Sequence, residues 1–206
     1  MKKLFLLLIL FSSTIGFTQK NKGKSAPKNV VLSKVDNISA EVISEKTGKR
    51  VVLFIKYEGK VDTLEVKKLD KADFKPTNFI IKSFTTQGKK LYHINWQEEI
   101  KVDTKLKKEN GVVTEDQLWD TETKKLLLGN TQKSSHIKET VFLDANKTAS
   151  HDVEKNRNEG FEFVLNADGS FALKTKTQNS IYVYNVTTGK YEIKGAPKSS
   201  GTKKKR

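Results

Sequence analysis

Residues 161–174 read FEFVLNADGSFALK, two short apolar runs on either side of an Asp-Gly turn. In the first run, Phe161, Phe163 and Leu165 alternate with other side chains, and the second run repeats this period. Because successive side chains of a strand point to opposite faces, a two-residue period predicts strands with one buried and one solvent-facing surface. The Asp-Gly pair supplies the backbone conformation of a tight turn. The stretch therefore predicts a β-hairpin.

Similar units recur along the chain. Turn-forming Gly, Asn or Asp residues separate runs rich in Val, Ile, Phe, Tyr, Leu and Thr. Paired runs of this kind are 51–57 with 61–66, 79–84 with 91–96, and 182–186 with 191–193. Short loops imply antiparallel neighbours, so residues 29–195 are predicted to form a single all-β domain, an antiparallel meander of about ten to thirteen strands. Because such long sheets curl, close or split, we expect a curved sheet or barrel, with a two-layer β-sandwich as the alternative.

One segment lacks this pattern. Residues 145–160 contain Val153 as their one sizeable apolar side chain. They are expected to form an exposed loop or a weak hairpin, because strand patterning needs alternating apolar residues.

The N-terminus has the parts of a secretory signal. A positive start and an uninterrupted apolar run at residues 4–11 precede small residues at Gly16 and Thr18. The run is far shorter than the roughly 20 residues of a membrane-spanning helix. Residues 1–18 are therefore predicted to be a cleavable signal peptide, with an uncleaved anchor or a buried helix as the alternative. The protein is expected in the periplasm or secreted, with no transmembrane span after cleavage, and its Met-Lys-Lys start is typical of bacteria.

The formal net charge of +15 is concentrated at the ends of the chain. The signal carries two positive charges, residues 19–28 carry four and residues 196–206 carry five, all without an acid, which leaves +4 for the remainder. The two stretches outside the signal are rich in Gly, Ser, Pro, Asn and Lys, a composition that predicts a disordered linker and a disordered tail. A basic tail gains roughly 1 kcal/mol per Lys or Arg near an anionic surface. The candidate contact residues are Lys20, Lys22, Lys24, Lys28, Lys203, Lys204, Lys205 and Arg206. The alternative is that these ends are solvated and only aid solubility.

Cysteine and histidine chemistry is limited. The chain has no cysteine, which excludes disulfides, a thiolate nucleophile, a thiolate metal site and a cysteine-linked lipid. Its three histidines, His93, His136 and His151, occur in no zinc-binding spacing. His93 is expected on a solvent-facing or ligand-lining surface, opposite its apolar neighbours. Trp96 and Trp119 lie in alternating segments and are expected in the core.

The carboxylates and serines show no catalytic pattern. Glu98 and Glu99 are adjacent and should diverge on a strand, whereas glycosidases need two carboxylates facing each other about 5 to 9 Å apart. Asp103, Asp120 and Asp144 are candidates for a site that forms only in the fold. A Gly-x-Ser-x-Gly nucleophile motif does not occur. No catalytic, cofactor-binding or metal-binding residue is assigned, and no cofactor is expected.

The sequence contains no diagnostic family motif. Its signal and hairpin rhythm are similar to those of small exported β proteins of Gram-negative bacteria. We expect a non-enzymatic exported binding or envelope-associated protein, whose partner is an apolar ligand in a curved sheet or an anionic envelope surface. Specific nucleic-acid binding is not expected, because neither stacking platforms on a basic face nor a reading helix is visible. Two alternatives are an exported hydrolase whose site assembles only in the fold, and a surface protein held to the anionic envelope by its basic ends.

Overall fold

The computed structural model describes residues 29–45, 48–69 and 76–195, which form thirteen strands in three antiparallel sheets. The N-terminal sheet consists of β1 (Val30–Val35), β2 (Ile38–Glu45), β3 (Gly48–Tyr57) and β4 (Lys60–Leu69). The middle sheet consists of β5 (Thr77–Thr86), β6 (Lys89–Asp103), β7 (Lys107–Asp120), β8 (Lys125–Phe142) and β9 (Ser150–Glu159). The C-terminal sheet consists of β10 (Glu162–Leu165), β11 (Phe171–Lys174), β12 (Asn179–Asn185) and β13 (Lys190–Ile193). The predicted all-β antiparallel meander is confirmed.

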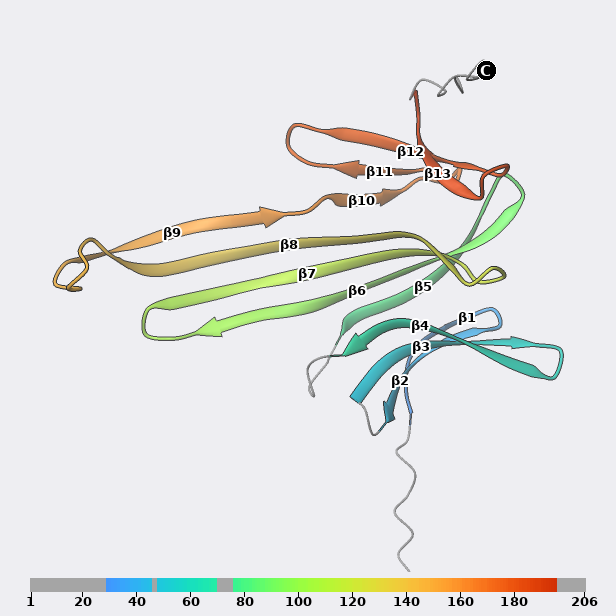
Figure 1. The fold of residues 1–206 in the computed structure, drawn as a ribbon, viewed down its shortest axis with the longest axis horizontal. Coiled ribbons are helices and arrows are strands. Elements are labelled where there is room, and N and C mark those ends of the chain that lie inside the picture. The colour runs from blue at the N-terminus through green and yellow to red at the C-terminus, as the bar shows by residue number, and fades with distance from the viewer. Residues whose placement is uncertain (1–28, 46–47, 70–75, 196–206) are drawn as a thin grey trace, which may run out of the picture.

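The three sheets are open. In each, consecutive strands are neighbours in the order in which they occur in the chain, so the first and last strands are edges. No barrel closes among the described residues. In Figure 1 the middle sheet lies between the N-terminal sheet and the C-terminal sheet.

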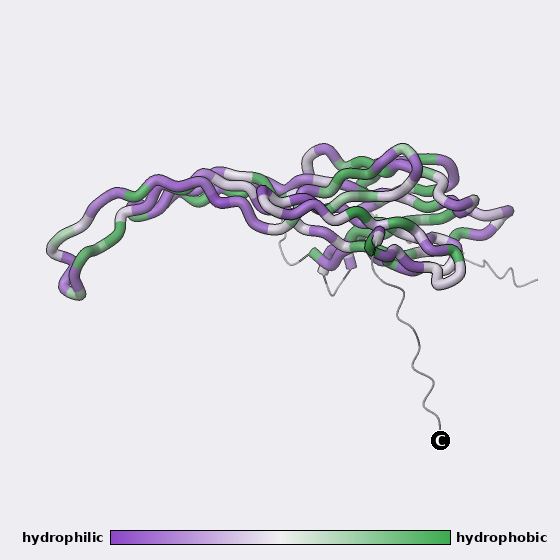
Figure 2. Tube along the Cα trace, turned by 90° about the horizontal axis from the view of Figure 1, so that it is seen from above, coloured by the Kyte–Doolittle hydropathy of each residue, from purple (hydrophilic) through white to green (hydrophobic). Residues whose placement is uncertain are grey.

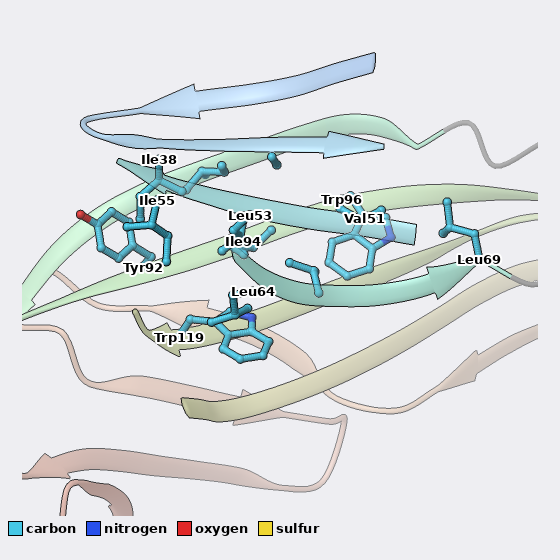
Figure 3. Close-up of a cluster of buried hydrophobic side chains, with 13 residues drawn as sticks. Ile38, Val51, Leu53, Ile55, Leu64, Leu69, Tyr92, Ile94, Trp96 and Trp119 are labelled. Atoms are coloured by element: carbon cyan, nitrogen blue, oxygen red, sulfur yellow. The ribbon is translucent and has the colours of Figure 1, made fainter. Parts of the chain in front are cut away.

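The main core lies between the N-terminal and middle sheets (Figure 3). On β3, half-buried Phe54 separates the buried Leu53 and Ile55. On β6, half-buried Asn95 separates the buried Ile94 and Trp96. Leu53, Ile94 and Trp96 are fully buried, and Phe79 stacks on Trp96 with ring centroids 5.6 Å apart. Fully burying an apolar side chain of this size contributes about 1.5–3 kcal/mol. The predicted core positions of both tryptophans are confirmed, since Trp119 also belongs to this cluster.

The C-terminal sheet packs against the middle sheet on its other face. His93 alternates with the core residues of β6, and its ring lies 4.9 Å from that of Phe163 on β10. Leu118 on β7 and Phe171 on β11 are also buried here. At the β10–β11 turn a Cβ on Gly169 would lie 2.4 Å from the side chain of Thr86, which shows how closely this turn packs on β5.

Strands β6 to β9 continue beyond both covering sheets as a four-stranded extension. β5 pairs with β6 only as far as Gln97, and β9 pairs only with the distal part of β8. We call this extension the arm; it comprises residues 98–103, 107–113 and 133–142 together with β9. Figures 1 and 2 show it projecting to one side of the molecule. At roughly 3.3 Å per residue, the ten residues of β9 span about 33 Å.

Residues 145–160, expected as an exposed loop or a weak hairpin, contribute the edge strand of the arm. The expected exposed loop is confined to residues 145–149, and Ser150–Glu159 forms the edge strand β9, one half of a hairpin whose other strand is β8. This segment has almost no apolar alternation, and its strand conformation follows from the hydrogen-bond ladder that β8 offers. At its end Gly160 adopts φ +80°, and a Cβ there would lie 2.1 Å from the carbonyl oxygen of Thr131. Glycine is required where the chain leaves the arm for β10.

Candidate functional site

His93 lies half-buried between the middle and C-terminal sheets. Its side chain is only 13% exposed, so of the two surfaces expected for it, solvent-facing or ligand-lining, the solvent-facing one is wrong. The error arises because β10 covers this face, which short-range patterning cannot reveal. Nε2 of His93 lies 2.8 Å from Oδ1 of Asp116, and Asn95 donates its amide to the same oxygen at 2.9 Å. The buried Asp116 carboxylate is thereby hydrogen-bonded twice, as a buried charge requires.

Among the described residues, no hydroxyl or thiol is hydrogen-bonded to this pair. A histidine that activates a nucleophile needs a hydroxyl or thiol within hydrogen-bond reach. The hydrogen-bond partner of the His93 ring in the described structure is Asp116, and its ring neighbour is Phe163. The arrangement therefore ties β6 to β7 beneath the C-terminal sheet.

The three candidate aspartates stabilise separate turns. Asp120 accepts hydrogen bonds from the backbone N–H groups of Glu122 and Thr123. Burial raises its pKa, but hydrogen bonds from Thr123 and the charge of Lys89 outweigh burial and leave the pKa lowered. In the described structure no contact joins Asp120 to either of the other two candidates, so the three do not form one site.

The other two candidates lie at the far end of the arm. Asp144 accepts hydrogen bonds from the backbone N–H groups of Thr148 and Ala149 at the β8–β9 turn, and these lower its pKa. Asp103 lies 4.0 Å from Lys108 across the β6–β7 turn. Both carboxylates are therefore engaged by groups of their own turns.

A buried carboxylate that sequence reasoning missed lies on one face of the arm. Glu109 is only 3% exposed and contacts Nζ of Lys107 at 2.7 Å and Nζ of Lys133 at 3.3 Å. Ser135 donates its hydroxyl to the same carboxylate at 2.8 Å. The hydrogen bond from Lys107, followed by those from Ser135 and Lys133, lowers the pKa of Glu109 to about 2. Because the partners come from β7 and β8, the cluster depends on strand register and has no local sequence signal.

The opposite face of the arm carries a polar groove. Two adjoining hollows of about 500 and 470 Å³ share Asn156 and Asn158 and lie between strands β7–β9 and the β11–β12 turn, residues 175–178. The residues of the groove on which the argument below depends are Asn110, Ser134, His136, Asn156, Asn158 and Lys176. In register, Asn110, His136 and Asn156 form one row across the three strands. The sequence marked His136 only as a histidine without a metal partner, and the asparagines carried no signal.

Hydrogen bonds within the groove fix its asparagines. The hydroxyl of Ser134 donates to Oδ1 of Asn158 at 2.8 Å, and Nδ1 of His136 lies 3.0 Å from Oδ1 of Asn156. Both amide oxygens are thus engaged. Neither Nδ2 group has a hydrogen-bond partner among the residues that the structure describes. The groove therefore presents N–H donors to solvent.

The predicted signal peptide and all eight candidate residues of the basic ends lie outside the described residues. Within the described ranges, no three His, Asp or Glu side chains lie together as a metal site. No helix long and apolar enough to cross a membrane occurs in that part of the chain. Comparison with known proteins finds no matching family model, no matching curated protein and no matching solved structure.

Proposed function

We propose that this protein is an exported, non-enzymatic binding protein, held near an anionic surface of the bacterial envelope by its basic ends and presenting its arm to a ligand. The observation that carries the proposal is the arm itself. Four strands extend beyond the two sheets that cover the rest of the middle sheet. One face of this extension carries a groove whose Asn156 and Asn158 amide N–H groups have no hydrogen-bond partner among the described residues.

The arm has the composition of a surface that remains in solvent. An exposed edge strand invites pairing with other chains, and charged side chains oppose such aggregation. β9 reads SHDVEKNRNE and carries six charged or imidazole side chains in ten residues. A sheet that is kept soluble while extended away from the core is suited to contact a partner along its face.

Binding is favoured over catalysis by the chemistry of the groove. Its side chains are mainly amides, hydroxyls and amines, which hold a ligand by hydrogen bonds. Glu162 is the acid that lines the groove, and it lies opposite Lys174 in register. General acid–base catalysis needs a titratable group that can meet the reacting atom. His136 is such a group in the groove, but both of its ring nitrogens are engaged, Nδ1 with Oδ1 of Asn156 and Nε2 with Oε1 of Glu154 at 3.0 Å.

The role of the ends is tested by neutralising their charges in the mature chain. Replacing the eight candidate Lys and Arg residues of the ends with Gln should greatly weaken sedimentation with anionic vesicles, because each exposed charge near such a surface contributes roughly 1 kcal/mol at low salt. Wild-type binding should fade as salt rises toward roughly 0.5 M. The matched control neutralises eight exposed lysines of the body, among them Lys56, Lys60 and Lys82.

Equal binding by the end-neutralised and control variants would refute the role of the ends. Export is tested by the intact mass of the protein recovered from periplasm and medium, which should begin within two residues of Gln19. Retention of residues 1–17 in that fraction would refute the signal peptide.

A further inference from the structure

We infer that the groove between strands β7–β9 and the β11–β12 turn binds an extended polysaccharide that carries carboxylate groups. This inference rests on the proposed binding function and names the ligand class of the same site. It follows from which groups the groove exposes, how they are spaced and which groups it lacks.

The exposed groups are mainly donors. The amide oxygens of Asn156 and Asn158 accept hydrogen bonds inside the groove, which turns their Nδ2 groups outward. Lys176 adds an ammonium group from the β11–β12 turn and has no ion-pair partner among the described residues. Lys174 and Lys176 outnumber Glu162 among the charged residues that line the hollows. Amide donors beside a net positive charge are complementary to a ligand rich in oxygen acceptors that also carries negative charge.

The spacing suits a repeating ligand. Neighbouring strands lie about 4.8 Å apart, and residues two apart on one strand are separated by roughly 6.8 Å. Asn156 and Asn158 are two apart on β9, and Ser134 and His136 face them from β8. The groove therefore offers a grid of polar groups on the scale of a sugar ring with its hydroxyls. Single hydrogen bonds at an exposed site are weak, so affinity should come from several units of a polymer bound together.

The groups that the groove lacks argue against other macromolecules. Peptides bind to β proteins mainly through strand edges and pockets for side chains, whereas these donors are side-chain amides on a sheet face. Single-stranded nucleic acids need aromatic platforms for base stacking, and no aromatic side chain lines the described hollows. A lipid surface needs exposed apolar side chains, and Val112 is the one sizeable apolar residue lining the groove. A glycan needs neither strand edges nor apolar pockets.

The test uses the full mature protein and titrates it calorimetrically with galacturonic acid octamers, neutral glucose octamers and single-stranded DNA of similar length. The wild type should bind the uronate octamer at least tenfold more tightly than either alternative. A uronate tetramer should bind more weakly than the octamer. Preference for DNA, or equal binding of the neutral glucan, would overturn the inference.

Two groove variants locate the site. The double substitution N156D/N158D replaces two donor amides with acceptor carboxylates of nearly the same shape, and it should weaken uronate binding at least tenfold. Lys176→Gln should reduce the preference for uronate over neutral glucan to about threefold or less. The matched control is Lys155→Gln. It removes a charge from β9, the strand that carries Asn156 and Asn158, but from the face opposite the groove. This variant should bind the uronate octamer as the wild type does. Circular dichroism establishes that each variant folds.

The end-neutralised protein separates this inference from the proposed function. If the groove is the site, that protein should lose vesicle binding and retain uronate binding. If uronate binding disappears with the basic ends and survives N156D/N158D, the groove assignment is overturned while electrostatic attachment stands. Loss of vesicle binding has no bearing on the groove result, so the two proposals fail separately.

Discussion

Strand β6 passes through two regions of different physical character, the body and the arm. In the body, Ile94 and Trp96 are fully buried between the N-terminal and middle sheets. Beyond Gln97 the same strand continues into the arm, where Glu99 and Lys101 are exposed. Pairing with β7 nevertheless continues without a register shift from Tyr92 to Asp103. A strand can therefore persist far beyond its core when a neighbour maintains the hydrogen-bond ladder.

The two regions differ in what stabilises them. The body gains free energy from apolar burial, at about 1.5–3 kcal/mol for each large side chain. Ile137 is the one buried large apolar side chain among the described residues of the arm. The arm is otherwise held across its strands by polar pairs, such as Lys155 with Glu139 at 2.6 Å and Thr140 with Asp152 at 2.8 Å. Exposed charge pairs contribute much less than core side chains do. The arm should therefore open locally before the body unfolds.

The largest expected effect comes from a cavity in the body. Leu53→Ala should lower the free energy of unfolding by about 2–5 kcal/mol, because it removes a fully buried side chain. The matched substitution in the arm, Val153→Ala, should lower it by less than about 1 kcal/mol, because Val153 is only half buried. Urea titration followed by tryptophan fluorescence measures both, since Trp96 and Trp119 lie in the body core. Equal effects would show that the arm and body share one core.

A smaller, local effect is expected from crowding the arm. A Cβ on Gly111 would lie 2.4 Å from both the carbonyl oxygen of Ser134 and Cβ of Ser135, so Gly111→Ala should force β7 and β8 apart. Overpacking of this kind costs about 1–3 kcal/mol. We expect faster amide exchange throughout the arm, with protection of the body retained. The control is Gly129→Ala on β8, where the nearest atom, Cδ2 of Leu126, is 3.7 Å away. Loss of protection in the body to the same extent would contradict a separable arm.

The smallest expected effect is the response of the arm to acid. Glu109 has a folded pKa of about 2 against an ordinary value of 4.5, so the unfolded state takes up the proton first as pH falls. Its stabilisation is therefore fully present above about pH 4.5 and is lost as the pH falls toward about 2. Amide exchange corrected for intrinsic rates should show the arm opening more readily at pH 2.5 than at pH 5.

The matched variant is Glu109→Gln, whose arm protection should change less over this range. Carboxylates with a lowered pKa also occur in the body, including Asp62 and Asp168. Acid unfolding of the whole protein would therefore not distinguish the arm from the body. A carbon-detected titration of Glu109 with a midpoint near 4.5 would contradict the proposed role of Lys107.

The predictable parts of the fold are those with local causes. The stretch at residues 161–174 forms the β10–β11 hairpin with Phe163 opposite Leu173, because side-chain alternation and turn chemistry act over a few residues. The core positions of Trp96 and Trp119 follow from the same alternation. The signal peptide and the basic ends also have local signatures, and they stay predictions because they lie outside the described residues.

Only the tertiary structure decided which sheet covers which face. His93 was expected on a solvent-facing or ligand-lining surface because its own strand presents it opposite the core, and β10, some seventy residues later, covers it. β9 has no apolar period and is a strand because β8 pairs with it. The amide N–H groups of Asn156 and Asn158 are available to a ligand because side chains of β8 engage the amide oxygens. The β11–β12 turn lines the same hollow. Alternation and turns are local properties that sequence alone determined here, whereas burial and the groove depend on contacts between residues distant in the chain.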